Sequence, residues 1–270
     1  MSIGYNKIDV GVGNYKLSPS QLTVFYRNPK EWMEGMNNKS RFSGNIASIK
    51  GTCVHYMFES HFDERTKDCY WQDVKEYLLS EVALETINTF ESDSIMEELT
   101  GMYDEVMEWI TDTDESEVVL SEPEVKYQLP PSIVGKCKQQ YWIAGSIDAI
   151  IKNDVGEYGI RDYKTSSRKA SSLDNYIHQL VTYAIAWNNT CESDMKVTFV
   201  EIVNIYPTKT KGRQFNVIRK YISDKQVKKM ETIYKEIVLT HKTALVYPQL
   251  ENLLYREGVS FMGAVEPLGD

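Results

Sequence analysis

Hydrophobic positions recur with a helical period in the first part of the chain. The stretch "SPSQL" has the pattern of a helix start, because Ser18 can cap, Pro19 fits the first helical position and Gln21 completes a capping box. Apolar residues then follow helical spacing after Gly51 and again from about residue 72 to residue 110. These patterns predict a largely helical first part.

A period of two replaces the helical period near Val118. Such alternation is typical of strands that bury one face. Five segments share it, at about residues 122–130, 139–152, 157–165, 196–207 and 214–222. One helix is expected between about Ser172 and Asn189, and a last helix begins at Ser223, where Gln226 can close a capping box.

The order of these elements predicts an α/β fold, with a central mixed β-sheet flanked by helices. An acidic helical segment, about residues 72–117, is expected as an insertion before the sheet. We expect a single domain over residues 1–270, with its core at about residues 118–222 and a C-terminal helix at about residues 223–245.

The chain carries a net charge of −9 over 270 residues. A protein that coats nucleic acid would be basic, so that role is disfavoured, whereas an enzyme that holds nucleic acid only in a cleft is compatible with this charge. No apolar run approaches the roughly 20 residues that span a bilayer, and the N-terminus lacks the apolar core of a signal peptide. We therefore expect no membrane association and a cytoplasmic location.

The four cysteines are widely separated, and no two of them form a C-x-x-C pair. This spacing disfavours a zinc knuckle and a locally bound iron–sulfur cluster. In the cytoplasm such cysteines are expected to be reduced thiols. They are Cys53, Cys69, Cys137 and Cys191.

The stretch "GSIDAIIKNDVGEYGIRDYKTSS", residues 145–167, carries the candidate chemistry. If its turn is centred near Val155, with Gly156 at positive φ, antiparallel pairing sets Asp148 opposite or nearly opposite Asp162. Directly opposed Cβ atoms lie roughly 4.5–5.5 Å apart. Lys164 shares the face of Asp162 because side chains alternate along a strand. The register thus predicts that two carboxylates and one ammonium group converge.

The neighbours of these charges favour a functional pair over surface aspartates with a salt-bridged lysine. Like charges directly opposed destabilise a sheet, and buried charges need partners or metals. The flanking residues are apolar or aromatic, so the strands are expected to be buried. Paired carboxylates suit Mg²⁺ or Mn²⁺, which lowers the pKa of a bound water, and a lysine can stabilise the developing phosphorane charge. Phosphodiester hydrolysis is the reaction class that fits.

At these residues the chain resembles the PD-(D/E)XK nuclease superfamily, in particular its RecB-like exonuclease branch. The core match, "GSIDAII…YGIRDYKTSS", follows the family pattern of G-x-x-D, a hairpin and D-x-K-T. "GTCVHYMFE" resembles the G-x-x-x-H motif and "HQLVTYAIAW" the Q-x-x-x-Y motif, and "LSPSQLTVFYRNPKEW" resembles the N-terminal S-x-S-x-L…P segment. The agreement extends over roughly Leu17 to Tyr206 and implies a restriction-endonuclease-like fold.

The resemblance implies a role for each matching residue. His55, Asp148 and Asp162 would bind the cation together with the main-chain carbonyl of Tyr163. Lys164 would be the catalytic lysine. The residues that would position the nucleic-acid strand or support the lysine complete the catalytic set, and they are Gln179 and Tyr183.

Several assignments stay open. Glu124 resembles an acidic residue on the preceding strand of the family, but Glu122 competes for that place. Glu59, one helical turn after His55, is either a neighbour of the metal ligands or part of a plain helix pair. Arg168 and Lys169 follow Lys164 closely and are candidates for phosphate contacts; these two and the positioning pair Gln179 and Tyr183 form the expected substrate-binding set.

The chain departs from some relatives that bind an iron–sulfur cluster through four cysteines. Asn28 stands where these relatives have the first cysteine, and Cys191 is the last cysteine of the chain, so no such cluster is expected. "GVGNY" lacks the ending of a phosphate-binding loop, so a stand-alone nuclease without an ATP motor is expected.

The sequence therefore predicts a Mg²⁺- or Mn²⁺-dependent DNA exonuclease that uses a metal-activated water. The resemblance alone favours exonuclease over a structure- or sequence-specific endonuclease. A catalytically silent nucleic-acid-binding or scaffold protein of the same fold is the alternative from another class. DNA ends are the expected partner, with a second copy of the chain or a recombination or replication protein as further candidates. A bacterial or phage-infected cytoplasm is the expected setting, and a phage-type protein in DNA repair or recombination is the expected context.

Overall fold

The computed structural model describes residues 3, 8–22, 25, 32, 45–112, 116–136, 138–191, 194–208 and 212–246. Its helices are α3 (Ile46–Phe62), α4 (Lys67–Ala83), α5 (Thr89–Asp112), α6 (Pro131–Val134), α7 (Ile177–Thr190) and α8 (Asp224–Val246), with a 3-10 turn η1 at Pro19–Gln21. Its strands are β1 (Tyr15–Leu17), β2 (Glu117–Ser121), β3 (Glu124–Gln128), β4 (Tyr141–Ser146), β5 (Ala149–Lys152), β6 (Tyr158–Thr165), β7 (Val197–Pro207) and β8 (Arg213–Tyr221).

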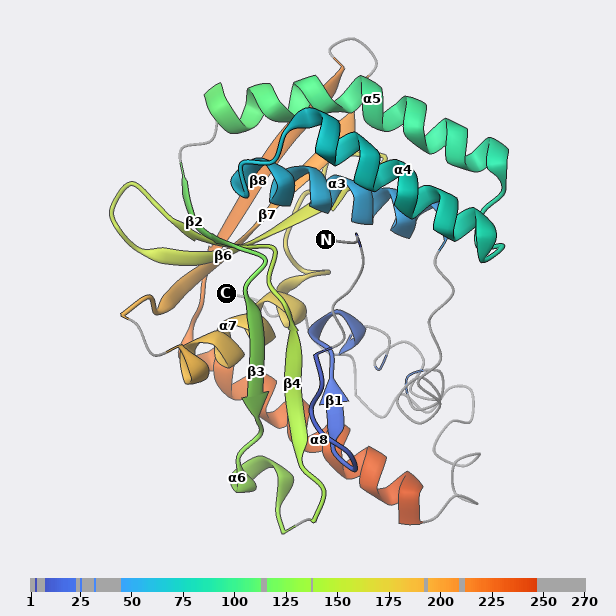
Figure 1. The fold of residues 1–270 in the computed structure, drawn as a ribbon. Coiled ribbons are helices and arrows are strands. Elements are labelled where there is room, and N and C mark those ends of the chain that lie inside the picture. Colours follow the sequence, from blue (N-terminus) through green and yellow to red (C-terminus); the bar gives the residue numbers. More distant parts are fainter. Residues whose placement is uncertain are drawn as a thin grey trace.

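The strands form two mixed sheets, which confirms the α/β class but replaces the single expected sheet. The larger sheet has the order β2-β5-β6-β7-β8, in which β6 and β7 are parallel and the other pairs are antiparallel. The smaller has the order β1-β4-β3, with β1 and β4 parallel. Figure 1 shows the smaller sheet running away from the larger one below the three helices α3, α4 and α5.

The two sheets separate because two neighbouring strands bend at the same level. The strand expected over residues 139–152 breaks between Ser146 and Ala149. Its partner breaks between Ser121 and Glu124, where Glu122 has a φ of 47° and Pro123 has no N–H to donate. The Glu122 N–H instead donates to the Asp148 carbonyl at 3.0 Å. The bend therefore lifts Glu122 and Asp148 out of the regular ladder.

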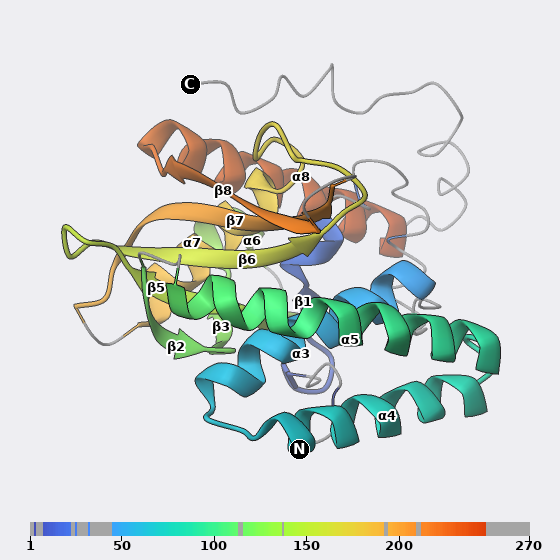
Figure 2. The ribbon, with the colours of Figure 1, turned by 90° about the horizontal axis from the view of Figure 1, so that it is seen from above.

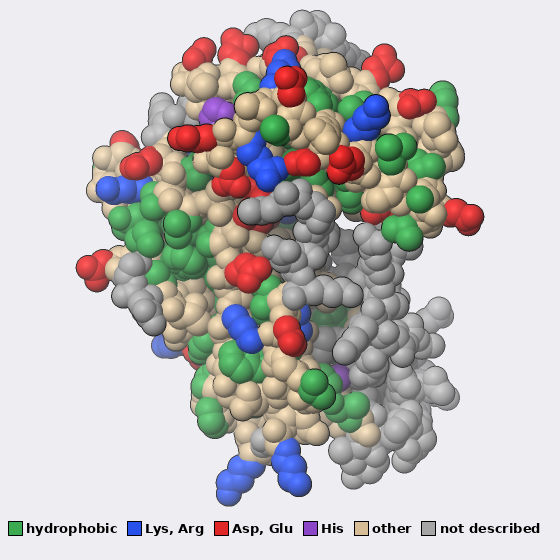
Figure 3. Space-filling view, in the orientation of Figure 1, with side chains coloured by type: hydrophobic (Ala, Val, Ile, Leu, Met, Phe, Trp, Pro, Cys, Tyr) green, Lys and Arg blue, Asp and Glu red, His purple; other side chains and the backbone are tan. Residues whose placement is uncertain are grey.

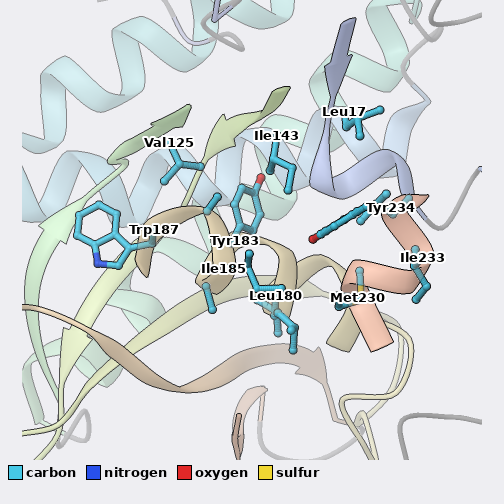
Figure 4. Close-up of a cluster of buried hydrophobic side chains, with 14 of the residues drawn as sticks. Leu17, Val125, Ile143, Leu180, Tyr183, Ile185, Trp187, Met230, Ile233 and Tyr234 are labelled. Atoms are coloured by element: carbon cyan, nitrogen blue, oxygen red, sulfur yellow. The ribbon is translucent and has the colours of Figure 1, made fainter. Parts of the chain in front are cut away.

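Helices cover both faces of the larger sheet, as Figures 1 and 2 show. On one face α3 and α5 pack against β6 and β8, and their apolar side chains share a core with Tyr163, Phe199 and Val203. On the other face α7 and α8 enclose a second core, part of which is drawn in Figure 4. No helix of the described ranges is long and apolar enough to cross a bilayer.

The acidic side chains of α5 are partly neutralised by basic residues of neighbouring elements. Glu98 lies 2.9 Å from the Nζ of Lys50 on α3, and Arg213 at the start of β8 lies 3.4 Å from Glu105. Figure 3 accordingly shows acidic and basic side chains interspersed over the part of the surface that these helices form. Arg213 thus lies beside carboxylates of α5.

Three helix starts test the expected capping signals. At α8 the capping box is confirmed, since Ser223 Oγ accepts from the Gln226 N–H at 3.3 Å and Gln226 Oε1 accepts from the Ser223 N–H at 2.8 Å. At Ser18 the capping box is wrong, because the Ser18 hydroxyl bonds the Ser20 hydroxyl at 3.1 Å and makes no side-chain cap bond to the 3-10 turn η1. The expected start near Ser172 is also wrong, because α7 begins at Ile177.

A buried histidine on α8 gives the fold a predictable pH dependence. His241 is fully buried, its Nδ1 lies 2.8 Å from the Tyr141 hydroxyl, and its ring packs edge-on against Tyr15. Burial lowers the pKa of His241 from 6.5 to about 4. The unfolded chain therefore takes up the proton first, so folding stability falls as the pH drops below about 6.5 and stops falling below about 4.

The variant His241→Gln should remove this loss. Relative to that variant, the wild-type protein should lose about 2 kcal/mol of unfolding free energy between pH 7 and pH 5. Urea unfolding of both proteins at the two pH values measures the difference. Parallel pH profiles for the two proteins would show that His241 does not titrate in this way.

Candidate active site

The hairpin of β5 and β6 has the register that the sequence predicts. Its turn is centred on Val155, with the Gly156 N–H donating to the Asn153 carbonyl at 3.0 Å and Gly156 at a φ of 86°. Ala149 pairs with Arg161, so continuing the register by one residue places Asp148 opposite Asp162. The two aspartates therefore lie where β6 extends past the bend in the neighbouring strand.

Three side chains from three elements gather at this bend. His55 of α3, Glu122 after β2 and Asp148 before β5 each offer one ligand atom, and these atoms lie within 4.8 Å of one another. His55 Nδ1 is 3.1 Å from Asp148 Oδ2, which also accepts the Tyr163 N–H at 2.8 Å. We call these three residues the acidic-histidine group.

Asp162, which is buried, and Lys164, which is partly buried, form an ion pair beside this group. The Nζ of Lys164 donates to Asp162 Oδ1 at 2.8 Å and lies 2.7 Å from Oδ2. Gln179 Nε2 also donates to Asp162 Oδ1, at 3.3 Å. Asp162 is 3% exposed, and its Oδ2 has no hydrogen bond. Asp162 thus contacts lysine and amide groups and is not one of the three residues of the acidic-histidine group.

The position of Lys164 is fixed from the other side by Tyr176, whose ring centroid lies 5.5 Å from the Nζ atom. Burial lowers the pKa of the Lys164 ammonium, but the charges of Asp162 and Asp148 more than offset this effect and leave its pKa above the usual value. Lys164 therefore stays a cation.

Burial is the largest influence on the pKa of each carboxylate in the site, and nearby charges add to it or oppose it. Burial and the charge of Asp148 raise the pKa of Glu122 to about 7. Burial also raises the pKa of Asp162, although Lys164 opposes it. For Asp148 burial acts in the same direction, but the attraction of His55 and Lys164 and the Tyr163 hydrogen bond leave its pKa lowered. A cation near Glu122 and Asp148 would relieve this repulsion.

The structure distinguishes the two glutamates that the sequence left open. Glu122 lies in the acidic-histidine group, and its Oε2 accepts the Ser146 hydroxyl at 2.7 Å. Glu124 is exposed on β3, where its backbone pairs with Ser146. The bend at Pro123 explains the difference, because it changes which side chains point toward Asp148. Glu59 is half-buried on α3 and lies outside the group.

Two of the predicted site tyrosines belong to the cores. The Tyr163 ring stacks on Phe58, with centroids 3.7 Å apart, so only its backbone faces Asp148. Tyr183 is 7% exposed and lies in the core drawn in Figure 4. A Cβ atom at Gly145 would come within 3.0 Å of the Tyr183 hydroxyl. Gly145 therefore makes room for Tyr183, which links the G-x-x-D and Q-x-x-x-Y segments by packing.

The two basic residues proposed for phosphate contacts, Arg168 and Lys169, lie on the loop between β6 and α7. Both are exposed, and neither forms an ion pair with a residue that the structure describes. They follow Lys164 by only a few residues.

The acidic-histidine group fits a divalent cation. One imidazole nitrogen and two carboxylates are donors that Mn²⁺ accepts, and Mg²⁺ prefers the oxygen ligands among them. Burial and the charge of Asp148 raise the pKa of Glu122, and the charge of His55 offsets them only in part. His55, Glu122 and Asp148 are therefore the residues that could hold the cation.

The variant Glu122→Gln should lower the affinity for Mn²⁺ by about 10- to 100-fold, because it removes one charged oxygen of the group. Glu124→Gln, two residues away on the exposed strand face, is the matched control and should bind Mn²⁺ like the wild-type protein. Isothermal titration with Mn²⁺ measures both. If Glu124→Gln lowers the affinity and Glu122→Gln does not, the assignment of the glutamate is wrong.

Comparison with known families matches residues 16–253 to the model of the PD-(D/E)XK nuclease superfamily. No curated protein sequence matches the chain. Solved structures similar to it include SSO0001, with 14% identity and a TM-score of 0.40 over 86% of this chain and 79% of that chain. They also include an exonuclease candidate from Eubacterium rectale, with 10% identity and a TM-score of 0.49 over 85% of this chain and 82% of that chain. The family match thus covers most of the chain.

Proposed function

The chain belongs to the PD-(D/E)XK nuclease superfamily, and we propose that it is a metal-dependent DNA exonuclease. PD-(D/E)XK nucleases use divalent metals, and nucleic acid is their substrate. Our proposal adds three specific points: the substrate is DNA, the metal is Mg²⁺ or Mn²⁺, and cleavage starts from an end. Placement in the RecB-like branch is also proposed, from the motifs that the chain shares with it.

One observation carries the proposal. The acidic-histidine group and the Asp162–Lys164 pair lie side by side, joined by the hydrogen bond from the Tyr163 N–H to Asp148. A group suited to a cation thus lies beside a lysine that stays charged. Hydrolysis of a phosphodiester requires both a way to stabilise negative charge and a nucleophilic water. This combination favours an active nuclease over a silent scaffold protein of the same fold.

The residues of the chain have separate tasks in this proposal. His55, Glu122 and Asp148 would hold the cation, while Asp162 is paired with Lys164. When bound, the divalent cation supplies Lewis-acid chemistry to the attacking water and the scissile phosphate. Lys164 would place its ammonium against the negative charge that develops on the phosphate. Gln179 would keep Asp162 oriented through its hydrogen bond to Oδ1.

Tyr183 has a supporting task in this scheme. Its ring fills the space over Gly145, three residues before Asp148. We propose that it fixes the backbone of this segment from the core rather than contacting the DNA strand. Arg168 and Lys169, on the loop between β6 and α7, are the candidates for phosphate contacts.

Linear and covalently closed circular DNA separate the exonuclease from the endonuclease alternatives. An exonuclease should release nucleotides from linear single- or double-stranded DNA and leave a closed circle of the same sequence intact. Labels at the 5′ end or at the 3′ end then give the polarity. Cleavage of the circle into discrete fragments would favour an endonuclease. The absence of any cleavage, with DNA binding retained, would favour the silent protein.

A further inference from the structure

The apolar strand β7 contains a buried asparagine next to the candidate catalytic lysine. Asn204 is 1% exposed and stands opposite Lys164 in the parallel pairing of β6 and β7. Its neighbours along the strand, Val203 and Ile205, are buried apolar residues. Burying an amide is costly unless it is hydrogen-bonded, so the partners of Asn204 indicate why it is there.

The side-chain hydrogen bonds that the structure gives Asn204 run to Lys164 and to the segment that follows it. Asn204 Oδ1 accepts the Ala170 N–H at 2.6 Å. Asn204 Nδ2 donates to the Ser166 hydroxyl at 2.8 Å and to the Lys164 carbonyl at 3.4 Å. One buried side chain therefore fixes both ends of the segment Ser166–Ala170.

Two further contacts complete this attachment. Asn216 on β8 donates its Nδ2 to the Ala170 carbonyl at 3.1 Å. Ser166 donates its hydroxyl to the Arg168 carbonyl at 2.5 Å, while its own N–H donates to Ile205 on β7 at 3.0 Å. The segment thus passes over the carboxyl ends of the parallel strands β6 and β7, the end of such sheets where ligands bind.

The exposed part of this segment is basic. Arg168 and Lys169 lie between the two attachment points, and both side chains are exposed. Only a few residues separate them from Lys164. Because an extended chain spans at most about 3.5 Å per residue, their backbone must lie near that of Lys164. A well-ordered backbone lowers the entropy that these long side chains lose when they contact a phosphate.

We propose that Asn204 is a positioning residue, which fixes the segment Ser166–Ala170 so that Arg168 and Lys169 contact the phosphates of the DNA strand beside the scissile bond. This inference rests on the proposed function and adds the residues that orient its substrate. Asn216 has the same task to a smaller extent, because it contributes one bond from the edge strand.

A purely structural amide in the same protein provides the matched control. Asn188 near the end of α7 also fixes a strand, since its Nδ2 donates to the Val197 carbonyl at 2.9 Å and its Oδ1 accepts the Val197 N–H at 2.8 Å. Val197 begins β7, and Asn204 lies seven residues along that strand, about 23 Å away. Asn188→Ala should thus lower stability without touching the proposed substrate path.

The test measures binding of a labelled single-stranded oligonucleotide by fluorescence anisotropy, with chelator present so that the DNA stays intact. Asn204→Ala should weaken binding by about tenfold and reduce the salt dependence of binding by about one phosphate contact. Asn216→Ala should give a smaller loss in the same direction, and Asn188→Ala should bind like the wild-type protein. Hydrogen exchange of the Ala170 amide should become faster in Asn204→Ala only.

Coupling between residues separates positioning from general destabilisation. Removing both basic side chains, Arg168→Ala with Lys169→Ala, should weaken binding in the wild-type protein but change little when Asn204 is already Ala. Additive losses would overturn the inference, and so would wild-type binding by Asn204→Ala together with fast exchange at Ala170. If the wild-type protein cleaves DNA but the Asn204 variants bind it normally, only this inference fails. A wild-type protein that neither binds nor cleaves DNA overturns the proposed function as well.

Discussion

Replacing Asp148 with Asn is expected to reduce DNA cleavage by at least about a thousandfold. Asp148 contacts His55 within the acidic-histidine group and links this group to β6 by accepting the Tyr163 N–H. Asn keeps the shape of the side chain but removes the charge that would hold a cation. The cleavage rate with Mg²⁺ or Mn²⁺ measures the loss, and titration with Mn²⁺ should show an affinity lowered by about 10- to 100-fold.

The same hairpin offers a control for this substitution. Asp154 lies in the exposed turn between β5 and β6, so Asp154→Asn makes the same chemical change away from the site. It should cleave DNA and bind Mn²⁺ at the wild-type level. Wild-type cleavage by Asp148→Asn, in a protein that is folded by circular dichroism, would remove Asp148 from the mechanism.

Replacing Lys164 with Met is expected to reduce cleavage by about a thousandfold or more while leaving a cation site in place. Met keeps much of the apolar stem but removes the ammonium that Asp162 and Tyr176 hold. Because Lys164 is not a ligand in our proposal, the affinity for Mn²⁺ should stay within a few-fold of the wild-type value. A loss of cleavage with retained Mn²⁺ binding thus separates Lys164 from the acidic-histidine group.

The loss of Lys164 also leaves the buried carboxylate of Asp162 without its cationic partner. Removing one partner of a buried pair typically destabilises a protein by about 3 kcal/mol. Cleavage should therefore be measured well below the melting temperature of the variant. Lys152→Met, on the neighbouring strand β5, is the control and should cleave DNA normally. A Lys164→Met protein that cleaves DNA at the wild-type rate would contradict the role given to the lysine.

The register of the hairpin could be predicted because it depends on local features alone. The turn residues Asn153 and Gly156 fix the centre of the hairpin, and alternation then determines which side chains share a face. The sequence therefore identified Asp148, Asp162 and Lys164 as neighbours. It could not show that Asp162 turns toward Lys164 and Gln179, because that choice depends on packing from α7.

The bend that creates the site could not be predicted from alternation. The residues 139–152 alternate well enough to suggest one strand, yet the backbone breaks at Ile147 and Asp148. The break depends on the partner strand, where Glu122 takes a positive φ before Pro123. Pro123 was visible in the sequence, and proline interrupts the hydrogen-bond ladder of a sheet. It could therefore have favoured Glu122 over Glu124 as the acidic residue of the site.

Buried polar groups on the central strands were missed for a different reason. Arg161 on β6 lies 2.7 Å from Glu201 on β7, which also contacts Arg219 on β8 at 2.8 Å. Asn204 likewise takes its partners from the segment after β6. Each of these buried polar side chains has its partner at least 18 residues away in the sequence. The periodicity of a single segment therefore gives no sign of the pairing. Polar interruptions in an otherwise apolar strand are the signal that could have identified these positions.

The start of α7 shows how tertiary contacts override a local helix signal. Its apolar period predicts a helix from Ser172, but the Ser172 hydroxyl instead bonds the Asp174 carboxylate at 2.8 Å. The chain before Ile177 belongs to the loop that Asn204 and Asn216 hold. Helix propensity is a weak preference, and these bonds outweigh it.

The most direct test of the account is the digestion of end-labelled linear DNA by the purified wild-type protein with Mg²⁺, with Mn²⁺ and with a chelator. We expect progressive release of labelled product with either metal, none with the chelator, and none from the Asp148→Asn protein. Equal digestion with and without chelator, or metal-dependent digestion that survives in Asp148→Asn, would contradict the claim that phosphodiester bonds are hydrolysed at this site.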